Sequence, residues 1–300
     1  MTKYLFNEEI SDWKSWGKVY QSIPAFEKLA KEIMKREGLP FSYLERLTPG
    51  TNAVFKIGEH VIKIFAPKET GMDQTSDEAT ERFAIKFAGS LGVNVPKIVA
   101  CGMIKDRYTF SYTVMKYING YEIGKALNGS DGEKLFTLGK KLRVITDKMN
   151  ISCQNFNGID VINDPDRSRR WETFPLSFQK ERQEYIKKHD YGKPVFTHGD
   201  LCADNVFLTN QNVLFIIDFA DAVAAPDCYE GALIAFEYRD YPDFLRGYFS
   251  KDDKELALSS VFDGILIHDF GGDIVKKAIG NTASLQKLDD LRHFIMKNII

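Results

Sequence analysis

The stretch HGDLCADNVFLTNQNVLFIIDFAD, residues 198–221, constrains the fold of this chain more than any other. Its runs VFLT and VLFII are β-prone and are joined by the Asn-rich NQN, which is typical of a β-hairpin. The open end of this hairpin carries several acceptor side chains: Asp200, Asp204, Asn205, Asp218 and Asp221. A hairpin with an apolar middle does not need these acceptors, so we expect this end to bind a ligand.

Antiparallel pairing across the turn brings Asn205 to within a residue or two of the position opposite Asp218. Hard oxygen ligands with few other protein donors suit Mg²⁺, which keeps waters and takes one or two carboxylates together with substrate phosphates. Asp200 lies on the loop that enters the hairpin, where it can orient an incoming hydroxyl. These residues therefore predict metal-assisted phosphoryl transfer.

The size and composition of the chain favour two lobes. It has 300 residues, of which 44% are hydrophobic and 13% aromatic, and a domain usually has about 100–200 residues. An apolar run long enough to span a membrane and a signal-peptide pattern are both missing from the sequence, so we expect a soluble, cytoplasmic protein without a membrane partner. The four cysteines are widely spaced and form no CxxC pair, which favours reduced thiols.

The charge is unevenly distributed along the chain. From His198 to the end there are 17 acidic against 9 basic residues, although the net charge of the whole chain is only -2. This asymmetry suits a polyanion bound toward the N-terminal side and a cation bound toward the C-terminal side, and solvated acidic helices would give the same count. A pI near 6.3 and the lack of a large basic pattern disfavour nucleic-acid binding.

The first part of the chain has the pattern helix, three strands, helix, two strands. SIPAFEKLAKEIMKREGLP has apolar residues at helical spacing, and FSYLERL, NAVFKI and HVIKIF form an antiparallel meander. A longer helix is expected over TSDEATERFAIKFAGSLG, where Thr75 and Glu78 match a capping box. VNVPKIVACGMI and RYTFSYTVMKYI are the last two strands.

From Asn119 onward the pattern is mainly helical. Leu135, Leu138, Leu142 and Ile145 form one helical stripe. A long polar stretch over residues 152–175 is interpreted as a functional excursion. It is followed by a helix near residues 177–189, then by the hairpin, and then by two or three helices over residues 229–300. His268 in LIHDFGGD is interpreted as a helix end with a Gly-Gly stop.

The spacing H-x-D-x-x-x-x-N, followed by a hairpin and Asp-Phe, resembles the catalytic and metal loops of protein kinases, with Gly199 in place of the usual Arg. HGDLCADN and IIDFADA resemble the aminoglycoside phosphotransferase family, a branch of the protein-kinase-like fold. DCYEGALIAFEY, from Asp227, looks like the helix after the metal loop in hygromycin B phosphotransferase-like members. The resemblance is specific in residues 198–240 and topological elsewhere.

This resemblance implies an α+β, two-lobed protein-kinase-like fold. We expect a small N-terminal lobe over residues 1–117, built on an antiparallel sheet that binds the nucleotide. A mainly helical C-terminal lobe over residues 118–300 would carry the catalytic loop, the metal loop and the acceptor-binding helices. By the same resemblance Asp200 is the catalytic base, while Asn205 and Asp218 hold Mg²⁺ under the nucleotide phosphates.

A kinase-like site also needs a lysine on the nucleotide phosphates and a carboxylate on a helix to hold it. Lys63 in VIKIF is favoured over Lys56, because Lys56 stands beside a turn, where a solvated lysine is the usual case. Glu81 is favoured over Glu78, which the capping box already explains. The loop LTPGTNAVF has no GxGxxG pattern, and the backbone of Gly50, Thr51 and Asn52 can either face phosphates or form an ordinary turn.

TVMKYING resembles the passage from strand to hinge in this family. Met115 would lie at its inner end, and backbone groups of Lys116 and Ile118 would meet the purine edge. Backbone hydrogen bonds do not reveal which purine is bound, so ATP is the default donor and GTP is an alternative.

The acceptor site is expected to be acidic. Asp221, Glu237 and Asp240 follow the metal loop and can hold a cationic acceptor by ion pairs, or they can be solvated. Trp171, Phe174 and the RSRRW run are candidates for one wall of this site, although arginines would repel a cation. Glu230 and His198 are interpreted as structural supports of the catalytic loop.

Three functions remain open at this point. The first is a Mg²⁺-dependent kinase of a hydroxyl of an aminoglycoside or aminocyclitol antibiotic, which would give resistance. The second keeps the chemistry and changes the acceptor to choline, a fructosamine or a sugar, since a fold does not determine a substrate. The third is a regulatory pseudokinase, which the retention of every expected catalytic residue disfavours. A monomer or a weak dimer is expected.

Overall fold

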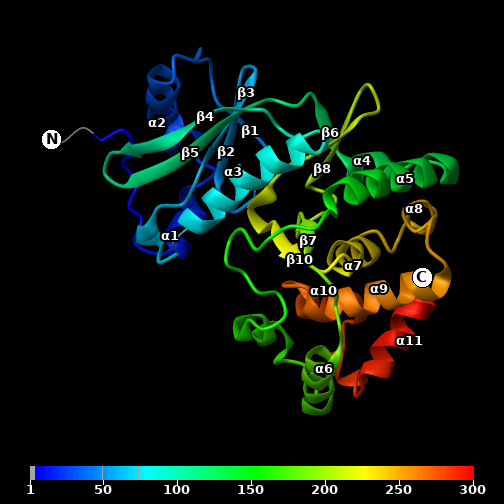
Figure 1. Ribbon diagram of the computed structural model, residues 1–300. Coiled ribbons are helices and arrows are strands. Elements are labelled where there is room, and N and C mark those ends of the chain that lie inside the picture. The colour runs from blue at the N-terminus through cyan, green and yellow to red at the C-terminus, as the bar shows by residue number, and fades with distance from the viewer. Residues whose placement is uncertain (1–3, 49, 73) are drawn as a thin grey trace. The chain divides into compact units, whose positions relative to one another are not determined.

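The computed structural model describes residues 4–48, 50–72 and 74–300, and the chain divides into two compact units. Unit 1 comprises Met1–Ala79 and Pro96–Asn119, and unit 2 comprises Thr80–Val95 and Gly120–Ile300. Helix α3, Thr75–Ser90, begins in unit 1 and ends in unit 2. Figure 1 labels the elements of both units, and each unit is described by itself below.

A five-stranded antiparallel sheet forms the centre of unit 1. Its order is β1-β2-β3-β5-β4, with the strands β1 Glu45–Arg46, β2 Ala53–Ile57, β3 His60–Ile64, β4 Ile98–Lys105 and β5 Thr109–Lys116. The predicted meander is confirmed, because β1, β2 and β3 pair in sequence order. Strand β1 has only two residues and is much shorter than the run FSYLERL suggested.

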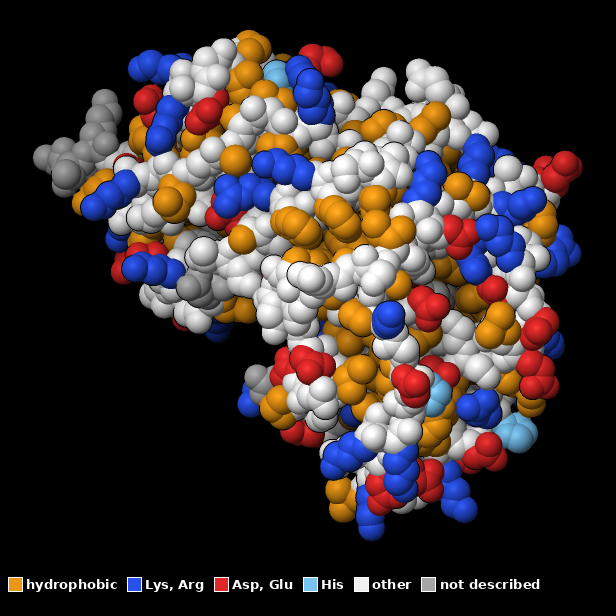
Figure 2. Space-filling view, in the orientation of Figure 1, with side chains coloured by type: hydrophobic (Ala, Val, Ile, Leu, Met, Phe, Trp, Pro, Cys, Tyr) orange, Lys and Arg blue, Asp and Glu red, His pale blue; other side chains and the backbone are white. Residues whose placement is uncertain are grey.

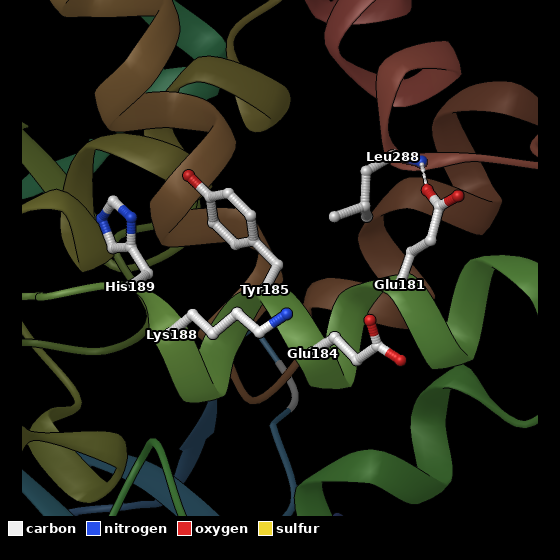
Figure 3. Close-up of a pocket in the computed structure, with 6 residues that line it drawn as sticks. All are labelled: Glu181, Glu184, Tyr185, Lys188, His189 and Leu288. Carbon is white, nitrogen blue, oxygen red and sulfur yellow. Dashed lines mark hydrogen bonds between the residues drawn. The ribbon is translucent and has the colours of Figure 1, made fainter.

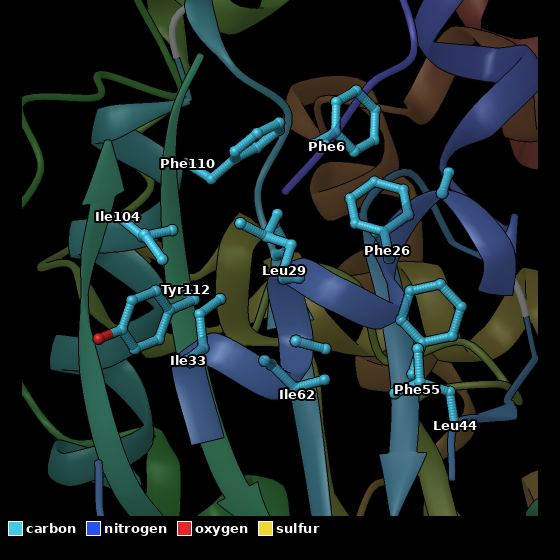
Figure 4. Close-up of a cluster of buried hydrophobic side chains, with 14 of the residues drawn as sticks. Phe6, Phe26, Leu29, Ile33, Leu44, Phe55, Ile62, Ile104, Phe110 and Tyr112 are labelled. Atoms are coloured by element: carbon cyan, nitrogen blue, oxygen red, sulfur yellow. The ribbon is translucent and has the colours of Figure 1, made fainter. Parts of the chain in front are cut away.

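Helix α2, Ile23–Arg36, packs its apolar side on this sheet, and Figure 4 shows the resulting core. The helix begins with a proline in its first turn and is followed by Gly38 at a φ of +66°, as the sequence predicted. Phe26 on α2 has its ring 5.0 Å from Phe6 and 5.6 Å from Phe55 on β2. Burying such a side chain stabilises the fold by roughly 1.5–3 kcal/mol. A short helix, α1 Trp13–Val19, was not predicted.

Helix α3 confirms the long helix expected from Thr75, but its start differs from the predicted capping box. Thr75 is already the first helical residue, and the backbone N–H of Glu78 donates to the carbonyl of Gln74 at 3.0 Å. The capping position is therefore Gln74 and not Thr75. The misassignment is one residue, which is the usual uncertainty of a helix end read from sequence.

Unit 2 is mainly helical and contains two small sheets. The first sheet has the order β6-β8-β9 and the second pairs β10 with β7. Their strands are β6 Gly120–Glu122, β7 Val195–Thr197, β8 Val206–Thr209, β9 Leu214–Ile216 and β10 Val223–Ala225. Strand β6 was not predicted, and it pairs with the hairpin strand β8.

The helices of unit 2 before the hairpin are α4 Ile123–Leu127, α5 Gly132–Met149 and α6 Leu176–Lys188. After the hairpin come α7 Cys228–Glu237, α8 Pro242–Tyr248, α9 Lys254–Ile267, α10 Gly271–Ile279 and α11 Leu288–Asn298. Residues 228–298 are all described, so the prediction of two or three helices in this region was wrong. A buried helix such as α7 is apolar all round and shows no amphipathic period, which hid these boundaries.

His268 stands at a helix end, as predicted, but the Gly-Gly pair after it is not the helix stop, contrary to the prediction. Helix α9 ends at Ile267, and α10 begins at Gly271 itself. A Cβ at Gly272 would overlap the backbone oxygen of Arg170. The two glycines therefore allow the first turn of α10 to approach the segment η2, Pro165–Trp171, closely.

No helix within residues 4–48, 50–72 and 74–300 combines the length and the apolarity that a membrane span requires. Figure 2 shows Lys, Arg, Asp and Glu side chains interspersed over the face that it draws. Among the described residues on that face, the basic side chains do not merge into one continuous surface.

Candidate active site

The hairpin β8–β9 is present and has the register that the sequence suggested. Val206 pairs with Ile216, and the backbone N–H of Ile217 donates to the carbonyl of Asn205 at 3.0 Å. Asp218 therefore lies one residue beyond the position opposite Asn205. The pairing places both side chains at the same open end of the hairpin.

Asp200 and Asn205 are joined directly in this end of the hairpin. The side-chain Nδ2 of Asn205 donates to the Asp200 carboxylate Oδ2 at 2.9 Å and to the Asp200 backbone carbonyl at 2.8 Å. Both amide hydrogens of Asn205 are used in these bonds to Asp200, and the acceptor Oδ1 is not part of them. Asn205 is only 8% exposed, which restricts these orientations.

The carboxyl of Asp200 is more basic than an ordinary aspartate. Burial raises its pKa to about 6, the carboxylate of Asp218 adds to this effect, and the hydrogen bond from Asn205 opposes it. A further contribution that raises the pKa comes from Glu237. Two carboxylates in one partly buried place repel each other, and a bound cation relieves this repulsion.

Asp218 has a backbone conformation that non-glycine residues rarely adopt. Its φ is 58° and its ψ is 69°, in the left-handed region, directly before the short helix η3, Phe219–Asp221. Such a conformation costs on the order of 1 kcal/mol and persists where the surroundings impose it. Asp218 stands between the end of β9 and the start of η3, and its backbone conformation sets the direction of its side chain.

The buried side chain of His198 supports the catalytic loop, as predicted. Its Nδ1 accepts the backbone N–H of Asp200 at 3.2 Å, and its Nε2 lies 2.9 Å from the carbonyl of Ile217. Burial lowers the pKa of His198 to about 4, so the imidazole is neutral at pH 7. The ring therefore joins the loop that carries Asp200 to the segment that carries Asp218.

Glu230 on α7 also supports this loop through hydrogen bonds to its backbone, as predicted. Its Oε2 accepts the backbone N–H of His198 at 2.6 Å and that of Gly199 at 3.4 Å. The side chain is completely buried, and burial raises its pKa to about 7, while the N–H groups of the loop oppose this rise. The loop thus depends on a carboxyl that lies 32 positions after His198 and 31 after Gly199.

Gly199 is the one position in this loop where a side chain does not fit. Its φ is +83°, and a Cβ would overlap the backbone oxygen of Asp221. The loop of Asp200 therefore lies directly against the end of η3. The usual Arg of protein kinases at this position would be incompatible with this packing.

Of the three acidic residues predicted for the acceptor, Glu237 is the best placed. Its Oε1 accepts the backbone N–H of Ala203 in the catalytic loop at 3.3 Å, and its charge raises the pKa of Asp200. Asp221 is exposed beside Gly199 at the end of η3. Asp240 is exposed after the end of α7, and its side chain has no recorded contact among the described residues that would link it to Asp200.

Trp171 and Phe174 do not form a wall of an open site, contrary to the prediction. They are 1% and 3% exposed and stack with Phe178 in the core of unit 2. The guanidinium of buried Arg182 lies over the Trp171 ring at 4.7 Å. The sequence alone does not distinguish a tryptophan that packs in an aromatic core from one that lines a ligand site.

Arg167 and Arg170 of the RSRRW run are paired with acidic residues. Arg167 Nη1 lies 3.7 Å from Asp269, and Arg170 Nη1 lies 2.7 Å from Asp273. Arg170 also approaches Asp269 at 3.6 Å. These pairs balance the charges of Arg167 and Arg170, which weakens the objection that this run would repel a cationic acceptor.

Lys63 is buried in unit 1, whereas Lys56 lies nearer the surface. Lys63 on β3 is 5% exposed, and it alternates with Ile62 and Ile64, which belong to the core beneath α2. Lys63 therefore lies on the face of the sheet away from that core. Lys56 forms an ion pair with Glu45 at 3.0 Å near the surface, which supports the choice of Lys63.

The structure also describes two other residues that were predicted for the nucleotide site, Glu81 and Asn52. Glu81 is 2% exposed on α3, one turn after Glu78. The Oδ1 of Asn52 accepts the backbone N–H of Ala66 at 3.2 Å and so stabilises unit 1 itself. Pro49, in the predicted phosphate-covering turn, lies outside the described residues.

The predicted hinge follows strand β5. Met115 is buried near the end of β5, and the backbone N–H of Lys116 donates to the carbonyl of Lys97 at 2.9 Å. This N–H is already bonded, so a purine contact by Lys116 would use its carbonyl. Ile118 is in the irregular segment between β5 and β6.

A pocket of about 360 Å³ lies elsewhere in unit 2, and Figure 3 shows its lining. Side chains of α6 project along it, and Glu181 accepts the backbone N–H of Leu288 at 2.9 Å. None of its lining residues is among those predicted for catalysis. The size of this pocket therefore does not locate the chemistry, which we place by the side-chain geometry of the hairpin.

The fold and this constellation define a kinase of small molecules with a protein-kinase-like architecture. Residues 51–258 match the model of the phosphotransferase enzyme family. The match covers more than half of the chain, and the chain belongs to this family. No curated protein sequence gives a match.

Solved structures with this fold include an aminoglycoside 2'-phosphotransferase of type IIIa in complex with GDP, at 17% identity and a TM-score of 0.61, covering 90% of this chain and 95% of that chain. Another is the aminoglycoside phosphotransferase APH(4)-Ia in a ternary complex with ADP and hygromycin B, at 16% identity and a TM-score of 0.60, covering 89% and 97%. A third is the choline kinase LicA from Streptococcus pneumoniae, at 16% identity and a TM-score of 0.57, covering 90% and 97%. Identities this low show the shared fold alone.

Proposed function

We propose that this chain transfers the γ-phosphate of ATP or GTP, in a Mg²⁺-dependent reaction, to a hydroxyl of a small cationic molecule of the aminoglycoside or aminocyclitol class. One observation carries this proposal: the Asp200 carboxylate is held by Asn205 at 2.9 Å and its pKa is raised by the Asp218 carboxylate. The proposed base and the two oxygens proposed to bind the metal thus lie at one end of the hairpin.

Asp200 has the properties of a catalytic base. An attacking hydroxyl must be oriented, and it gives up its proton during phosphoryl transfer. With a pKa of about 6, Asp200 is ionised at pH 7 and accepts a proton more readily than an ordinary aspartate. The hydrogen bonds from Asn205 and Cys202 go to Oδ2, so Oδ1 is the atom we assign to the acceptor hydroxyl.

The donor set at the hairpin end fits Mg²⁺. Asn205 would contribute its Oδ1 and Asp218 its carboxylate, and both are hard oxygen ligands. When bound, the ion would neutralise charge on the β- and γ-phosphates. Only two protein oxygens are assigned, as expected for an ion that completes its shell with water and phosphate.

Unit 1 is proposed to bind the nucleotide. Buried Lys63 would neutralise the α- and β-phosphates, and the backbone of Lys116 and Ile118 would meet the purine. Glu81, which belongs to unit 2, is the acidic partner that the family resemblance implies for Lys63. We assign Asn52 to shaping this region, because its side chain is bonded to the backbone of Ala66. The nucleotide complexes of the structural relatives support a nucleotide donor.

A positive charge on the acceptor is supported by the acidic surroundings of Asp200. Besides burial, Glu237 and Asp218 raise its pKa, as two nearby negative charges do. Ammonium groups of an acceptor would be attracted to Glu237 and Asp221, with Asp240 as a more distant contributor. In an organism exposed to such antibiotics this activity would give resistance.

A metabolite acceptor is the second candidate. One structural relative is a choline kinase, and choline is itself a cation with one hydroxyl. The acidic surroundings of Asp200 suit choline as well as an aminocyclitol, and a fructosamine or a sugar is a further alternative. A regulatory pseudokinase is disfavoured, because every residue that the chemistry requires is present.

The test is a coupled assay of nucleoside diphosphate release with purified protein. ATP and then GTP are offered with aminoglycosides, aminocyclitols, choline, a fructosamine and neutral sugars, and ³¹P NMR identifies the phosphorylated hydroxyl. Asp200→Ala is the negative control. Asp204→Asn, an exposed carboxylate of the same loop, is the matched control.

Turnover on an aminocyclitol that disappears in Asp200→Ala supports the proposal. Turnover on choline or a sugar alone transfers it to the metabolite alternative. Binding of MgATP without turnover on any acceptor of this panel would contradict the proposed acceptor class.

A further inference from the structure

The polar stretch before helix α6 contains a tight turn that takes no part in the site described above. The Oδ1 of Asn155 accepts the backbone N–H of Asn157 at 3.3 Å and that of Gly158 at 2.7 Å. The Nδ2 of Asn155 donates to the carbonyl of Ile159 at 2.9 Å. Gly158 has a φ of +77°, which suits a glycine. One side chain thus closes the turn and fixes the backbone around Asn157.

The ring of Phe156, in the same turn, contacts both helix α3 and strand β7. Its centroid lies 4.7 Å from that of Phe83 on α3 and 5.8 Å from that of Phe196 on β7. Phe196 in turn stacks on Phe219, the first residue of η3, with the centroids 6.5 Å apart. These apolar contacts hold the turn against its neighbours and keep Asn157 close to η3.

The side chain of Asn157 connects two segments that are distant in sequence. Its Nδ2 donates to the carbonyl of Ala222 at 2.9 Å and lies 3.5 Å from the Oγ1 of Thr80, near the limit of a hydrogen bond. Its Oδ1 accepts the backbone N–H of Ile159 at 3.4 Å. These partners fix the orientation of the amide, because a carbonyl only accepts and a backbone N–H only donates. Ala222 and Thr80 are both buried, so water does not readily replace a bond that is lost here.

Both partners of this side chain stand close in sequence to residues of the proposed nucleotide site. Ala222 caps η3, since its N–H donates back to the first residue of η3 at 3.2 Å, and η3 begins directly after Asp218. Thr80 directly precedes Glu81 on α3. Asn157 therefore joins the far end of the turn that follows Asp218 to the helix that carries Glu81.

The other end of α3 is also bonded to the hairpin. Asn94, shortly after α3, donates from its Nδ2 to the carbonyl of Leu214 at 3.1 Å, and its own carbonyl accepts the N–H of Ile216 at 2.9 Å. Both partners are on β9, the strand that leads to Asp218. The part of α3 in unit 2 is thus joined to this region at its end through Asn94 and at its start through Asn157.

We propose that Asn157 is a positioning residue for the metal-nucleotide complex, whose side-chain N–H groups hold the Ala222 carbonyl and the start of α3 at Thr80 in one arrangement. Loss of these donors frees the far end of η3, so Asp218 loses part of the constraint on its direction. This inference rests on the proposed function for its effect on binding, because Asp218 is the metal ligand in that function. The bridge itself is a property of the folded chain.

Three substitutions separate the parts of this bridge. Asn157→Asp keeps the volume and the acceptor for Ile159, but it turns an acceptor toward the Ala222 carbonyl. Asn163→Asp is its matched control, because it adds the same charge at an exposed position of the same polar stretch. Thr80→Val keeps the shape of the side chain and removes the oxygen at the α3 end of the bridge.

The bridge is tested first without any ligand, by hydrogen exchange of the whole protein followed by mass spectrometry. Asn157→Asp should speed exchange in the peptides that cover residues 80–84 and 219–223 by roughly threefold to tenfold, the range of one lost hydrogen bond. Asn163→Asp should leave both segments unchanged. Faster exchange confined to the turn itself, residues 155–159, would overturn the bridge.

Nucleotide titration with and without Mg²⁺ then tests the positioning role. Asn157→Asp should weaken MgATP binding by roughly tenfold, as for the loss of a group that supports a metal ligand, and leave binding of ATP alone within about twofold. Asn157→Ala, which adds no charge, should show the same pattern. Thr80→Val should cause a smaller loss, and its addition to Asn157→Asp should change the affinity by less than about twofold, since both remove the same contact.

Equal losses with and without Mg²⁺, or fully additive effects of the two substitutions, would give Asn157 a general structural role and overturn the positioning role. Failure of the proposed function gives a different result. If the wild type binds MgATP and phosphorylates no acceptor, the acceptor class is wrong and the results for Asn157 stand. If Mg²⁺ does not affect nucleotide binding in the wild type, Asp218 is not a metal ligand and the positioning role is wrong with it, while hydrogen exchange still decides the bridge.

Discussion

The core of unit 1 and the catalytic loop of unit 2 are both buried, but they are stabilised in opposite ways. The core beneath α2 consists of rings such as Phe6, Phe26 and Phe55, which need no hydrogen-bonding partner. The catalytic loop is held by polar groups, with His198 and Glu230 bonded to its backbone and both completely buried. The apolar core supplies stability, whereas the polar contacts fix the orientation of one carboxylate.

This difference has an electrostatic consequence. Apolar burial leaves no titratable group behind, but burial of the loop raises the pKa of Asp200 to about 6 and that of Glu230 to about 7. Groups with shifted pKa values are a cost to folding and an advantage to chemistry near neutral pH. Substitutions in the two regions should therefore affect different measurements.

The largest expected effect is on turnover. Asp200→Ala should lower kcat by roughly 100-fold to 10,000-fold, which is the typical contribution of a general base. Binding of the nucleotide should change little, because Asp200 is assigned to the acceptor hydroxyl. Steady-state kinetics with the acceptor found by screening measures the first effect, and nucleotide titration measures the second.

Asp204→Asn is the control for charge, since this exposed carboxylate belongs to the same loop. It should leave kcat within about threefold if the base is specific. Equal losses in both variants would mean that the negative potential of the loop matters and that Asp200 is not a base.

The next effect is on stability and belongs to the apolar core. Phe26→Ala should lower the free energy of unfolding by about 3–5 kcal/mol, through lost burial and the cavity that remains. Tyr43→Ala, an aromatic residue of unit 1 that is 67% exposed, should change it by less than about 0.5 kcal/mol. Denaturant unfolding measures both, and kcat per folded molecule should be the same in both variants as in the wild type.

The apolar core was largely predictable from the sequence. The helical spacing in SIPAFEKLAKEIMKREG gave α2 nearly to the residue, and the β-prone runs gave the strands of the five-stranded sheet. The convergence of Asn205 and Asp218 was also predictable, because the register of a hairpin follows from its two runs and its turn. These features depend on residues that are close in sequence.

The supports of the catalytic loop were only partly predictable. The family resemblance indicated Glu230, but no local pattern connects Glu237 with the backbone N–H of Ala203, which lies 34 positions before it. The prediction that Trp171 and Phe174 line an open site was wrong for the same reason, since burial depends on packing partners such as Phe178 and Arg182. Long-range packing leaves little trace in one sequence.

The third effect is a pH dependence that comes from Glu230. The folded-state pKa is raised from 4.5 to about 7 by burial, so between these values the folded chain binds the proton more tightly than the unfolded chain does. Stability from this group is therefore present at low pH and is lost as the pH rises from about 4.5 to about 7. Each pKa unit corresponds to about 1.4 kcal/mol, so the total loss is on the order of 3 kcal/mol.

Glu230→Gln removes this titration and keeps one oxygen that can accept the N–H groups of His198 and Gly199. We expect the wild type to lose stability relative to the variant across this pH range, and the difference to be constant above about pH 7. Unfolding in denaturant at several pH values measures it. A difference that does not change with pH would show that Glu230 is not buried as a titrating group.

A smaller effect is expected on binding of the metal-nucleotide complex. Asp218→Asn removes the proposed charged ligand and should weaken MgATP binding by roughly 10-fold to 100-fold, as for the loss of a group that supports a metal site. The stabilisation of the protein by MgATP in a thermal shift should shrink accordingly. An undiminished shift would exclude Asp218 as a ligand, while ATP without Mg²⁺ serves as the control for the nucleotide alone.

The smallest effects compare two lysines of the same sheet. Lys63→Met should weaken nucleotide binding by roughly tenfold, because a buried lysine that neutralises phosphate is lost, while the aliphatic stem is retained. Lys56→Met removes an ion pair with Glu45 in which the side chains are 25% and 37% exposed, so it should change stability by less than about 0.5 kcal/mol and leave nucleotide binding unchanged. Nucleotide titration of both variants decides between them. A loss of affinity in Lys56→Met without one in Lys63→Met would reverse the assignment, because the solvated lysine would then be the one that meets the phosphates.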